Sequence, residues 1–415
     1  MSSEIDGKID GKIVVLGLQH TFVMFGATVL VPLITGLDVG VTLFAAGIGT
    51  WLFHIVTKFK VPVFLGSSFA FIPPILAVTQ QTGDIRFATG GILVAGLMYV
   101  IVAGIFKFVK YETLHKILPP QVTGPMIILI GMMLAGVAIS NANGTNSPAI
   151  VEKLGANGAW GIALFTFAVA VFVKRVFKGF ISALPVLIAL VSGYLLAIIL
   201  GVVDFTAIGN ASWFGLPHFQ FPKFAVGPIV MIVPIAFVTM IEHFGDVLAI
   251  GNVVGKDFIK DPGIHRTLLG DGLATSLSAL IGGPANTTYS ENTGAVALTG
   301  IFNPVVMRIA AIFAILLSVI PKFTALIGTI PGPVIGGISI LLFGMISSIG
   351  IKNMVDAKVD LTLPGNLMVT AVMLVLGLGG ASFEFGAINL SGLGLAAIVG
   401  IILNLILNFN SFKKA

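Results

Sequence analysis

Four carboxylates lie within or next to apolar stretches of the chain, where a charged group has little water around it. They are Glu242, Asp246, Asp271 and Glu291. A charge at the centre of a bilayer costs at least about 2.5–3.5 kcal/mol on insertion scales, so such residues are functional candidates. Glu242 and Asp246 are four residues apart, which places both on one helix face and beside one cavity. Adjacent carboxylates titrate as a unit, so this pair predicts a proton carrier.

Each of these carboxylates also has a structural alternative. Glu242 and Asp246 could bond backbone carbonyls between helices, and Asp271 could pair with Arg266, which lies close to it in sequence. Glu291 follows Ser290 near the start of a predicted half-helix, where the helix dipole favours an anion and backbone N–H groups are free. Glu291 could also be a helix-start carboxylate without a ligand. As sites for a ligand, Glu242 and Glu291 favour one with N–H groups, because an ionised carboxylate only accepts hydrogen bonds.

Aromatic and imidazole side chains are the other candidates. Phe69 lies at a break in its span, which favours it as a stacking wall for a flat ring, although most of the 32 phenylalanines face lipid or the core. His20, His54 and His243 lie in apolar spans, where helix packing is expected to satisfy them. His20 is the best of the three as a proton relay. Since the chain has no cysteine, no metal-ligand spacing and no soluble-enzyme motif, we expect no metal, no cofactor other than the coupling proton and no enzymatic activity.

The elements that position these residues must be membrane helices. Of 415 residues, 57% are hydrophobic and 9% are charged, and the mean hydropathy is +1.09, which is more apolar than one soluble core requires. We expect fourteen spans, which are residues 13–35, 40–57, 62–80, 87–106, 119–140, 157–173, 180–201, 224–250, 267–283, 287–300, 304–320, 329–349, 364–382 and 389–409.

The distribution of basic residues predicts the orientation. If the N-terminus is cytoplasmic, the inner segments hold 18 of the 22 Lys and Arg residues, so both termini are expected in the cytoplasm. The net charge of +5 therefore reflects topology, and we expect no nucleic-acid partner.

Two of the spans are too polar and too interrupted for ordinary helices. Residues 61–71 run from β-branched and aromatic to small and polar, and Pro73 and Pro74 follow; residues 282–294 are rich in Gly, Asn, Thr and Ser. Each reads as a short extended piece followed by a half-helix. The two breaks fall in the third and tenth spans, which are corresponding positions in two inverted seven-span halves. Broken backbone at membrane depth is tolerated where it lines a cavity, so the pair indicates a transport site, although Gly and Pro could simply serve packing.

Four stretches of the chain match motifs of a known family. They are residues 19–32 (QHTFVMFGATVLVP), residues 66–71 (GSSFAF), Glu242-His243 and residues 286–292 (NTTYSEN). With these motifs the chain resembles the nucleobase-ascorbate transporter family, also called nucleobase:cation symporters, and in particular its uracil-transporting branch.

The resemblance implies one membrane transporter domain, residues 1–415, of two inverted seven-span repeats. Its core part is residues 13–116 and 224–320, and its gate part is residues 117–223 and 321–409. Spans three and ten would carry short antiparallel strands before their half-helices. The family commonly forms homodimers through the gate part.

The resemblance also implies roles for the site residues. Glu242 and Glu291 would hold the ligand, Phe69 would pack against its ring, and Ser290 would donate its backbone N–H, at a position where glycine is often seen. Glutamate at 291 favours a pyrimidine, because purine-transporting relatives tend to carry glutamine there. Asp246 departs from the histidine that a uracil carrier may have, which leaves room for another nucleobase.

Together these observations predict an alternating-access symporter in the bacterial plasma membrane that imports uracil with a proton. The proton-coupling candidates are Glu242, Asp246, His20 and Asp271. The alternatives are a purine (xanthine or urate) symporter, an anion transporter of the same fold, and an intramembrane enzyme. The sequence leaves proton or sodium coupling open.

Overall fold

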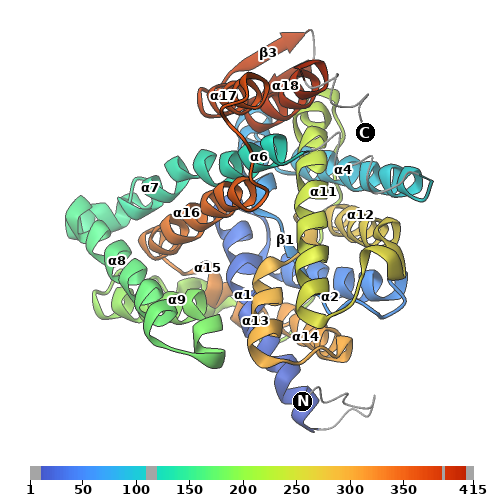
Figure 1. Ribbon diagram of the computed structural model, residues 1–415. Helices are drawn as coiled ribbons and strands as arrows, with labels where there is room; N and C mark the ends of the chain where they lie inside the picture. The colour runs from blue at the N-terminus through green and yellow to red at the C-terminus, as the bar shows by residue number, and fades with distance from the viewer. Residues whose placement is uncertain (1–10, 109–118, 386–387, 408–415) are drawn as a thin grey trace.

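The computed structural model of the protein describes residues 11–108, 119–385 and 388–407 (Figure 1). Within these ranges the side chains of residues 12, 27, 290, 291, 384, 385 and 388–391 are not described. The end of the predicted core part (109–116), the start of the predicted gate part (117–118) and residues 408–409 of the last predicted span lie outside the described residues.

The first half of the chain is helical apart from one short strand. Its elements are α1 (Gly11–Thr35), α2 (Val39–Val56), β1 (Leu65–Ser67), η1 (Phe69–Phe71), α3 (Ile72–Thr82), α4 (Arg86–Phe106), α6 (Pro120–Met133), α7 (Ala135–Ala142), α8 (Pro148–Val176), η2 (Gly179–Ala183), α9 (Pro185–Ile199) and α10 (Thr206–Asn210). Several of these helices begin with proline, whose fixed φ and missing N–H suit the first turn.

The described part of the second half is also mostly helical and contains three short strands. Its elements are α11 (Val226–Val254), η3 (Ile259–Gly263), α12 (Ile264–Leu280), β2 (Asn286–Thr288), α13 (Ser290–Thr299), α14 (Pro304–Ser318), α15 (Pro321–Gly328), α16 (Gly332–Asp356), α17 (Pro364–Leu378), β3 (Ser382–Phe385), β4 (Ile388–Ser391) and α18 (Gly392–Leu407). In Figure 1, α7, α8, α9 and α16 lie on one side, α2, α4, α12 and α14 lie on the other, and α1, α11 and α13 lie between them.

Seven helical stretches in the described part are long and apolar enough to cross a membrane, so the chain is a multi-pass membrane protein. They are α1, α2, α4, α6 with α7, α8, α11 and α16. Helices α14 and α15 would make an eighth span, but they meet at a bend of 85°. The shorter apolar helices α9, α17 and α18 also coincide with predicted spans. The number fourteen stays a prediction.

Several predicted boundaries differ from those in the structure. The gap between the predicted spans 119–140 and 157–173 contains the first turns of α8, which starts at Pro148 and is kinked at Gly155, where φ is 71°. The span 389–409 was placed too early, because residues 388–391 form β4, paired with β3, and the helix begins at Gly392. Helix α14 ends at Ser318, close to the predicted end of the span 304–320, and α15 is a separate short helix in residues assigned to no span.

The two expected strands are confirmed, and they pair with each other. Strands β1 and β2 are antiparallel, with Leu65 opposite Thr288 and Ser67 opposite Asn286. Half-helices α3 and α13 follow them, so the pairing brings both breaks to one place. There is no space for a side chain at Gly66, whose Cβ would lie 2.4 Å from the Tyr289 ring. The backbone therefore packs directly against the aromatic ring beside the strand pair.

A connecting segment, residues 211–225, crosses the side of the molecule formed by α2, α4 and α12. The Lys223 amide donates to Arg86 O (2.9 Å), and the Lys223 ammonium lies 2.9 Å from Asp84. Arg86 and then Lys223 hold the pKa of Asp84 below its usual range, because both donate hydrogen bonds to its carboxylate. The segment is thereby attached to the start of α4.

Alanine in place of Gly90 should destabilise the protein, because its Cβ would lie 1.9 Å from Lys223 O and would displace this segment. Such overpacking typically costs about 1–3 kcal/mol. The matched control is Gly104→Ala on the same helix, where a Cβ meets nothing within 4 Å and alanine favours the helix. Thermal unfolding followed by size-exclusion chromatography measures both variants. Equal melting temperatures for the two would contradict the prediction.

Candidate functional site

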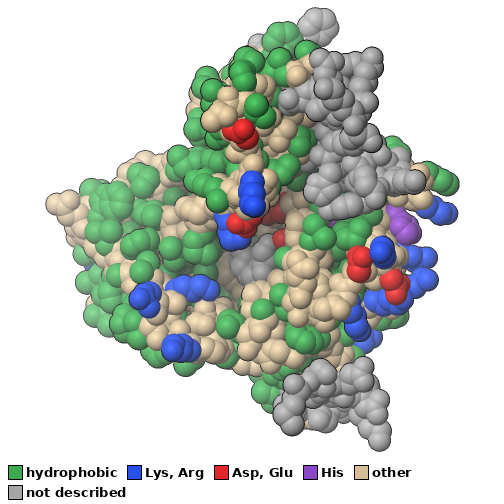
Figure 2. All heavy atoms as spheres, in the orientation of Figure 1, with side chains coloured by type: hydrophobic (Ala, Val, Ile, Leu, Met, Phe, Trp, Pro, Cys, Tyr) green, Lys and Arg blue, Asp and Glu red, His purple; other side chains and the backbone are tan. Residues whose placement is uncertain are grey.

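A cavity of about 360 Å³ lies between the β1–β2 pair, helix α11 and helix α16. Figure 2 shows the molecule hollowed between α11 and α16, with basic and acidic side chains at the rim. Its lining combines the polar strand ends with apolar helix faces, and consists of residues 67–70, 127, 130, 241, 242, 245, 246, 249, 287–289, 346, 349, 352, 353 and 356. A flat, polar molecule with a few hydrogen-bonding groups suits such a mixed lining.

Glu242 and Asp246 both line this cavity from α11, as their spacing of four residues led us to expect. Glu242 is half-buried, and Asp246 is buried with 8% of its surface exposed. The Thr288 hydroxyl lies 3.5 Å from Asp246 Oδ2, so the carboxylate on the helix is linked to strand β2. The cavity therefore holds two acidic groups within one helical turn of each other.

Behind Asp246 lies a fully buried hydrogen-bonded network. His243 Nδ1 is 2.8 Å from Asp271 Oδ2 and 3.1 Å from the Thr288 hydroxyl, and both the His243 and Asp271 side chains are 0% exposed. The Thr288 amide also donates to Asp271 Oδ2 (3.2 Å), and His243 Nε2 lies 2.9 Å from the Thr267 hydroxyl. Asp271 Oδ1 has no hydrogen-bond partner among the described residues. Thr288 thus contacts both the cavity carboxylate and the buried pair.

The structure excludes the alternative in which Asp271 pairs with Arg266. Arg266 donates to Val56 O (3.1 Å) and does not pair with Asp271, whose partner is His243 on α11. The expectation that helix packing satisfies His243 is confirmed by its three polar contacts. None of them could be paired from sequence, because two come from α12 and one comes from β2.

His20 lies away from the cavity, beside α13. It is buried, with Nδ1 2.7 Å from Asn292 Oδ1, and its Nε2 has no partner among the described residues. His54 bonds Val63 O (3.0 Å) and serves the link before β1. The role of His20 as a relay stays a prediction, since the structure places it next to the second half-helix and not on the cavity wall.

Phe69 does lie at the cavity, at the start of the first half-helix. Its ring meets Phe343 of α16 edge to face, with centroids 5.9 Å apart and planes at 78°. Helix α13 begins at Ser290, directly after the cavity residue Tyr289. The side chains of Ser290 and Glu291 lie outside the described residues, so the ligand roles predicted for them stay predictions.

Sequence reasoning missed two groups of cavity residues. One is the strand and its end, Thr287 to Tyr289, where the Tyr289 hydroxyl donates to Ser67 O (2.9 Å). The other is the polar end of α16, where Lys352 and Asp356 form an ion pair at the cavity. Their spacing of four residues at the end of an apolar run was the available signal.

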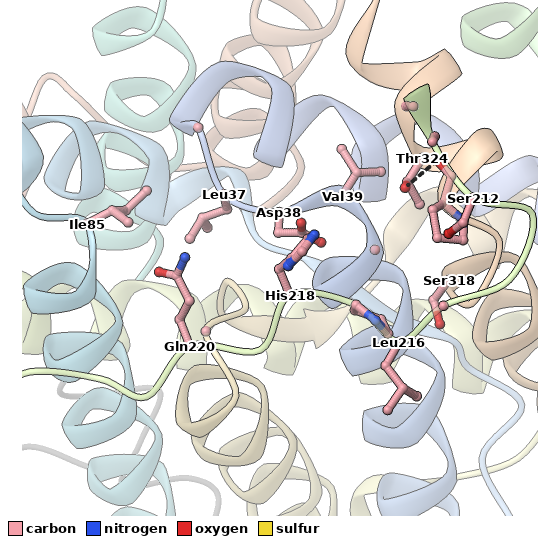
Figure 3. Close-up of a pocket in the computed structure, with 18 of the residues that line it drawn as sticks. Leu37, Asp38, Val39, Ile85, Ser212, Leu216, His218, Gln220, Ser318 and Thr324 are labelled. Atoms are coloured by element: carbon pink, nitrogen blue, oxygen red, sulfur yellow. Dashed lines mark hydrogen bonds between the residues drawn. The ribbon is translucent and has the colours of Figure 1, made fainter. Parts of the chain in front are cut away.

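A second and larger cavity, of about 870 Å³, lies by the start of α2 and the connecting segment. Asp38, His218 and Gln220 are among its lining residues (Figure 3). The Asp38 side chain caps the N-terminus of α2, where it accepts a hydrogen bond from the Val41 amide (2.7 Å). None of the predicted site residues lines this cavity, whereas Phe69, Glu242 and Asp246 line the smaller one.

Spanning helices, two half-helices joined by a strand pair, and buried carboxylates beside a cavity define this class of protein as a membrane transporter. The profile described as "Permease family" matches residues 11–384, and the chain belongs to this family, the nucleobase-ascorbate transporters. The expectation that the protein is a transporter and not an enzyme is confirmed by this membership.

Individual relatives agree with this membership. The chain is 44% identical to a uracil permease of Bacillus caldolyticus over 406 residues, which covers 96% of this chain and 92% of that protein. It is 44% identical to a uracil permease of Bacillus subtilis (strain 168), covering 94% and 91% of the two chains. The solved transmembrane domain of the cyanobacterial bicarbonate transporter BicA shares the fold, with a TM-score of 0.64 and 17% identity, over 95% of this chain and 97% of that one.

Proposed function

We propose that this protein imports uracil into bacterial cells by proton symport across the plasma membrane. The observation that carries the proposal is the cavity in which Glu242 and Asp246 face the paired strands. Uracil presents N–H donors and carbonyl acceptors on a flat ring, which suits carboxylates, strand-end polar groups and an aromatic wall at Phe69. The uracil permeases among the relatives support the same substrate.

We further propose the finer architecture that the family resemblance implies. The chain would have fourteen spans in two inverted repeats, a core part and a gate part as defined above, cytoplasmic termini and a homodimer through the gate. The ion pair of Lys352 and Asp356 lies at the cavity, and Lys352 belongs to a segment that charge asymmetry assigns to the cytoplasm. The cavity would then open inward in this conformation.

For coupling, Glu242 is the proposed site that takes up a proton with the ligand. Asp246 and the Thr288 hydroxyl lie between the cavity and the His243–Asp271 pair, so they offer a route by which a proton reaches a buried store. Movement of the core against the gate would then expose the loaded site to the other side of the membrane. Release of the proton would restore the charged carboxylate and complete the cycle.

Uptake of radiolabelled uracil into proteoliposomes tests this function. A proton gradient of one pH unit, inside alkaline, should support up to about tenfold accumulation per proton, because 1.4 kcal/mol is a factor of ten in concentration. A protonophore should abolish the accumulation, and a sodium gradient of the same size should not replace it. Accumulation driven by sodium would overturn proton coupling, and stronger competition by xanthine than by unlabelled uracil would overturn the substrate.

A further inference from the structure

A third cavity, of about 270 Å³, separates two groups of helices and adjoins the transport cavity. Helices α1 and α13 form one wall, and η2 with the start of α9 and helix α16 form the other. Its lining is mostly apolar, with residues such as Phe22, Leu187, Leu298 and Met345, and Lys174 is the one charged side chain among the described residues that line it. Tyr289 and Ile349 line both this cavity and the transport cavity, so they form the partition between the two.

Lys174 lines this cavity, and two further basic residues, Arg175 and Lys178, follow it closely in the chain. Lys174, Arg175 and Lys178 are exposed at the end of α8 and the start of η2, and none of them forms an ion pair within the part of the chain that the structure describes. Figure 2 shows Lys and Arg side chains gathered on the side of α8 and α9, with no Asp or Glu visible among them. Exposed apolar residues, Phe172 and Phe177, alternate with the basic ones.

We propose that this cavity binds an acyl chain of an anionic phospholipid, whose headgroup phosphate is held by Lys174, Arg175 and Lys178. An apolar space of this size is unfavourable for water, which needs polar partners. The bilayer supplies hydrocarbon chains at the same depth, and a basic cluster next to spanning helices attracts acidic headgroups. The occupant is therefore a lipid of the leaflet on which Lys174 lies.

The two walls of the cavity belong to the two parts that the proposed transport cycle moves against each other. A lipid seated between them stabilises the arrangement in which the space is open, since a ligand shifts an equilibrium by its differential affinity for the two states. Anionic lipid should thus regulate the transport rate. This regulatory consequence rests on the proposed function, whereas the binding site itself does not.

Native mass spectrometry of the purified full-length protein, titrated with phosphatidylglycerol or phosphatidylcholine, tests the headgroup site. The wild type should hold phosphatidylglycerol at a much lower lipid concentration than phosphatidylcholine. Joint replacement of Lys174, Arg175 and Lys178 by glutamine should remove this preference, a change of about 100-fold at about fivefold per basic residue. The control is Lys153→Gln at the opposite end of α8, which should keep the preference. Equal binding of the two lipids by the wild type would overturn the headgroup site.

A cavity-filling variant tests the chain-binding part. A Cβ at Gly294 meets nothing within 4 Å, so Gly294→Leu projects into the cavity without a clash at the backbone. It should reduce adducts of both lipids at least tenfold, and Leu298→Trp should do the same if Gly294→Leu fails to fold. Wild-type adduct levels in a folded filling variant would overturn the cavity as the site. Adduct counts do not depend on uracil, so a failed uracil assay leaves this result intact.

Discussion

Glutamine in place of Glu242 should abolish proton-driven uracil accumulation and weaken uracil binding by about 10- to 100-fold. The Glu242 side chain lines the cavity from α11 and is a charged carboxylate until it takes up its proton, and hydrogen bonds to a charged group contribute about 1.5–3 kcal/mol each. Glutamine keeps the shape of the side chain, but it replaces one acceptor by a donor and cannot carry a proton. A ligand N–H that faced the carboxylate would meet an amide N–H instead. Isothermal titration with uracil and gradient-driven uptake measure the two effects separately.

The control for this variant is another carboxylate of the same cavity. Asp356 lies at the end of α16, where its side chain is 59% exposed and paired with Lys352. Asp356→Asn should change uracil affinity by less than about threefold, because exposed ion pairs contribute only about 0–1 kcal/mol. Full coupling in Glu242→Gln would refute the proposed carrier. Equal damage in both variants would point to the total charge of the cavity instead of one carboxylate.

The variant Asp271→Asn should keep the fold of the protein but lose proton coupling. Asp271 Oδ2 receives the contacts of His243 and of the Thr288 amide, while Oδ1 has no partner in the described part of the chain. An asparagine oxygen at the Oδ2 position keeps both contacts with neutral His243, and its NH₂ group occupies the Oδ1 position. The geometry therefore survives, but the negative charge that would stabilise a protonated His243 is gone. We expect uracil binding and uracil counterflow to persist, and gradient-driven accumulation to be lost.

Alanine at the same position gives the contrasting result. Asp271→Ala leaves His243 Nδ1 and the Thr288 amide without their shared acceptor, and each buried donor left unsatisfied costs about 1–3 kcal/mol. Thermal unfolding in detergent should therefore show a large loss of stability for the alanine variant and a small one for the asparagine variant. Accumulation at the wild-type level in Asp271→Asn would mean that the pair is structural and that the proton does not use it.

Much of this architecture could be predicted from the sequence, because hydrophobic runs and their polar interruptions determine the structure of the short segments in which they occur. The polar breaks near residues 66 and 287 predicted an extended piece and a half-helix each, and β1 and β2 are there. The spacing of Glu242 and Asp246 predicted a shared helix face, and both line one cavity.

Contacts between distant elements could not be predicted in the same way. Asp271 had a plausible partner nearby in Arg266, and only the packing of α12 against α11 and β2 shows that its partner is His243. The hairpin of β3 and β4 was missed because apolar strand residues before α18 read as helix in a hydropathy window. Lys352 was counted only as a topology residue, since its spacing from Asp356 predicts an ion pair on the helix but does not show that the end of α16 reaches the cavity.

The pairing of β1 with β2 also sets the order in which the protein can be made. Strand β1 leaves the ribosome about 220 residues before its partner in the register, Asn286 to Thr288, has been synthesised. Unpaired backbone groups cannot remain in hydrocarbon without a cost of several kcal/mol each. During biogenesis the unpaired backbone groups of β1 must therefore stay in contact with water, with the insertion machinery or with neighbouring helices of the first half. The binding site is completed as a late step, when the second half of the chain enters the membrane.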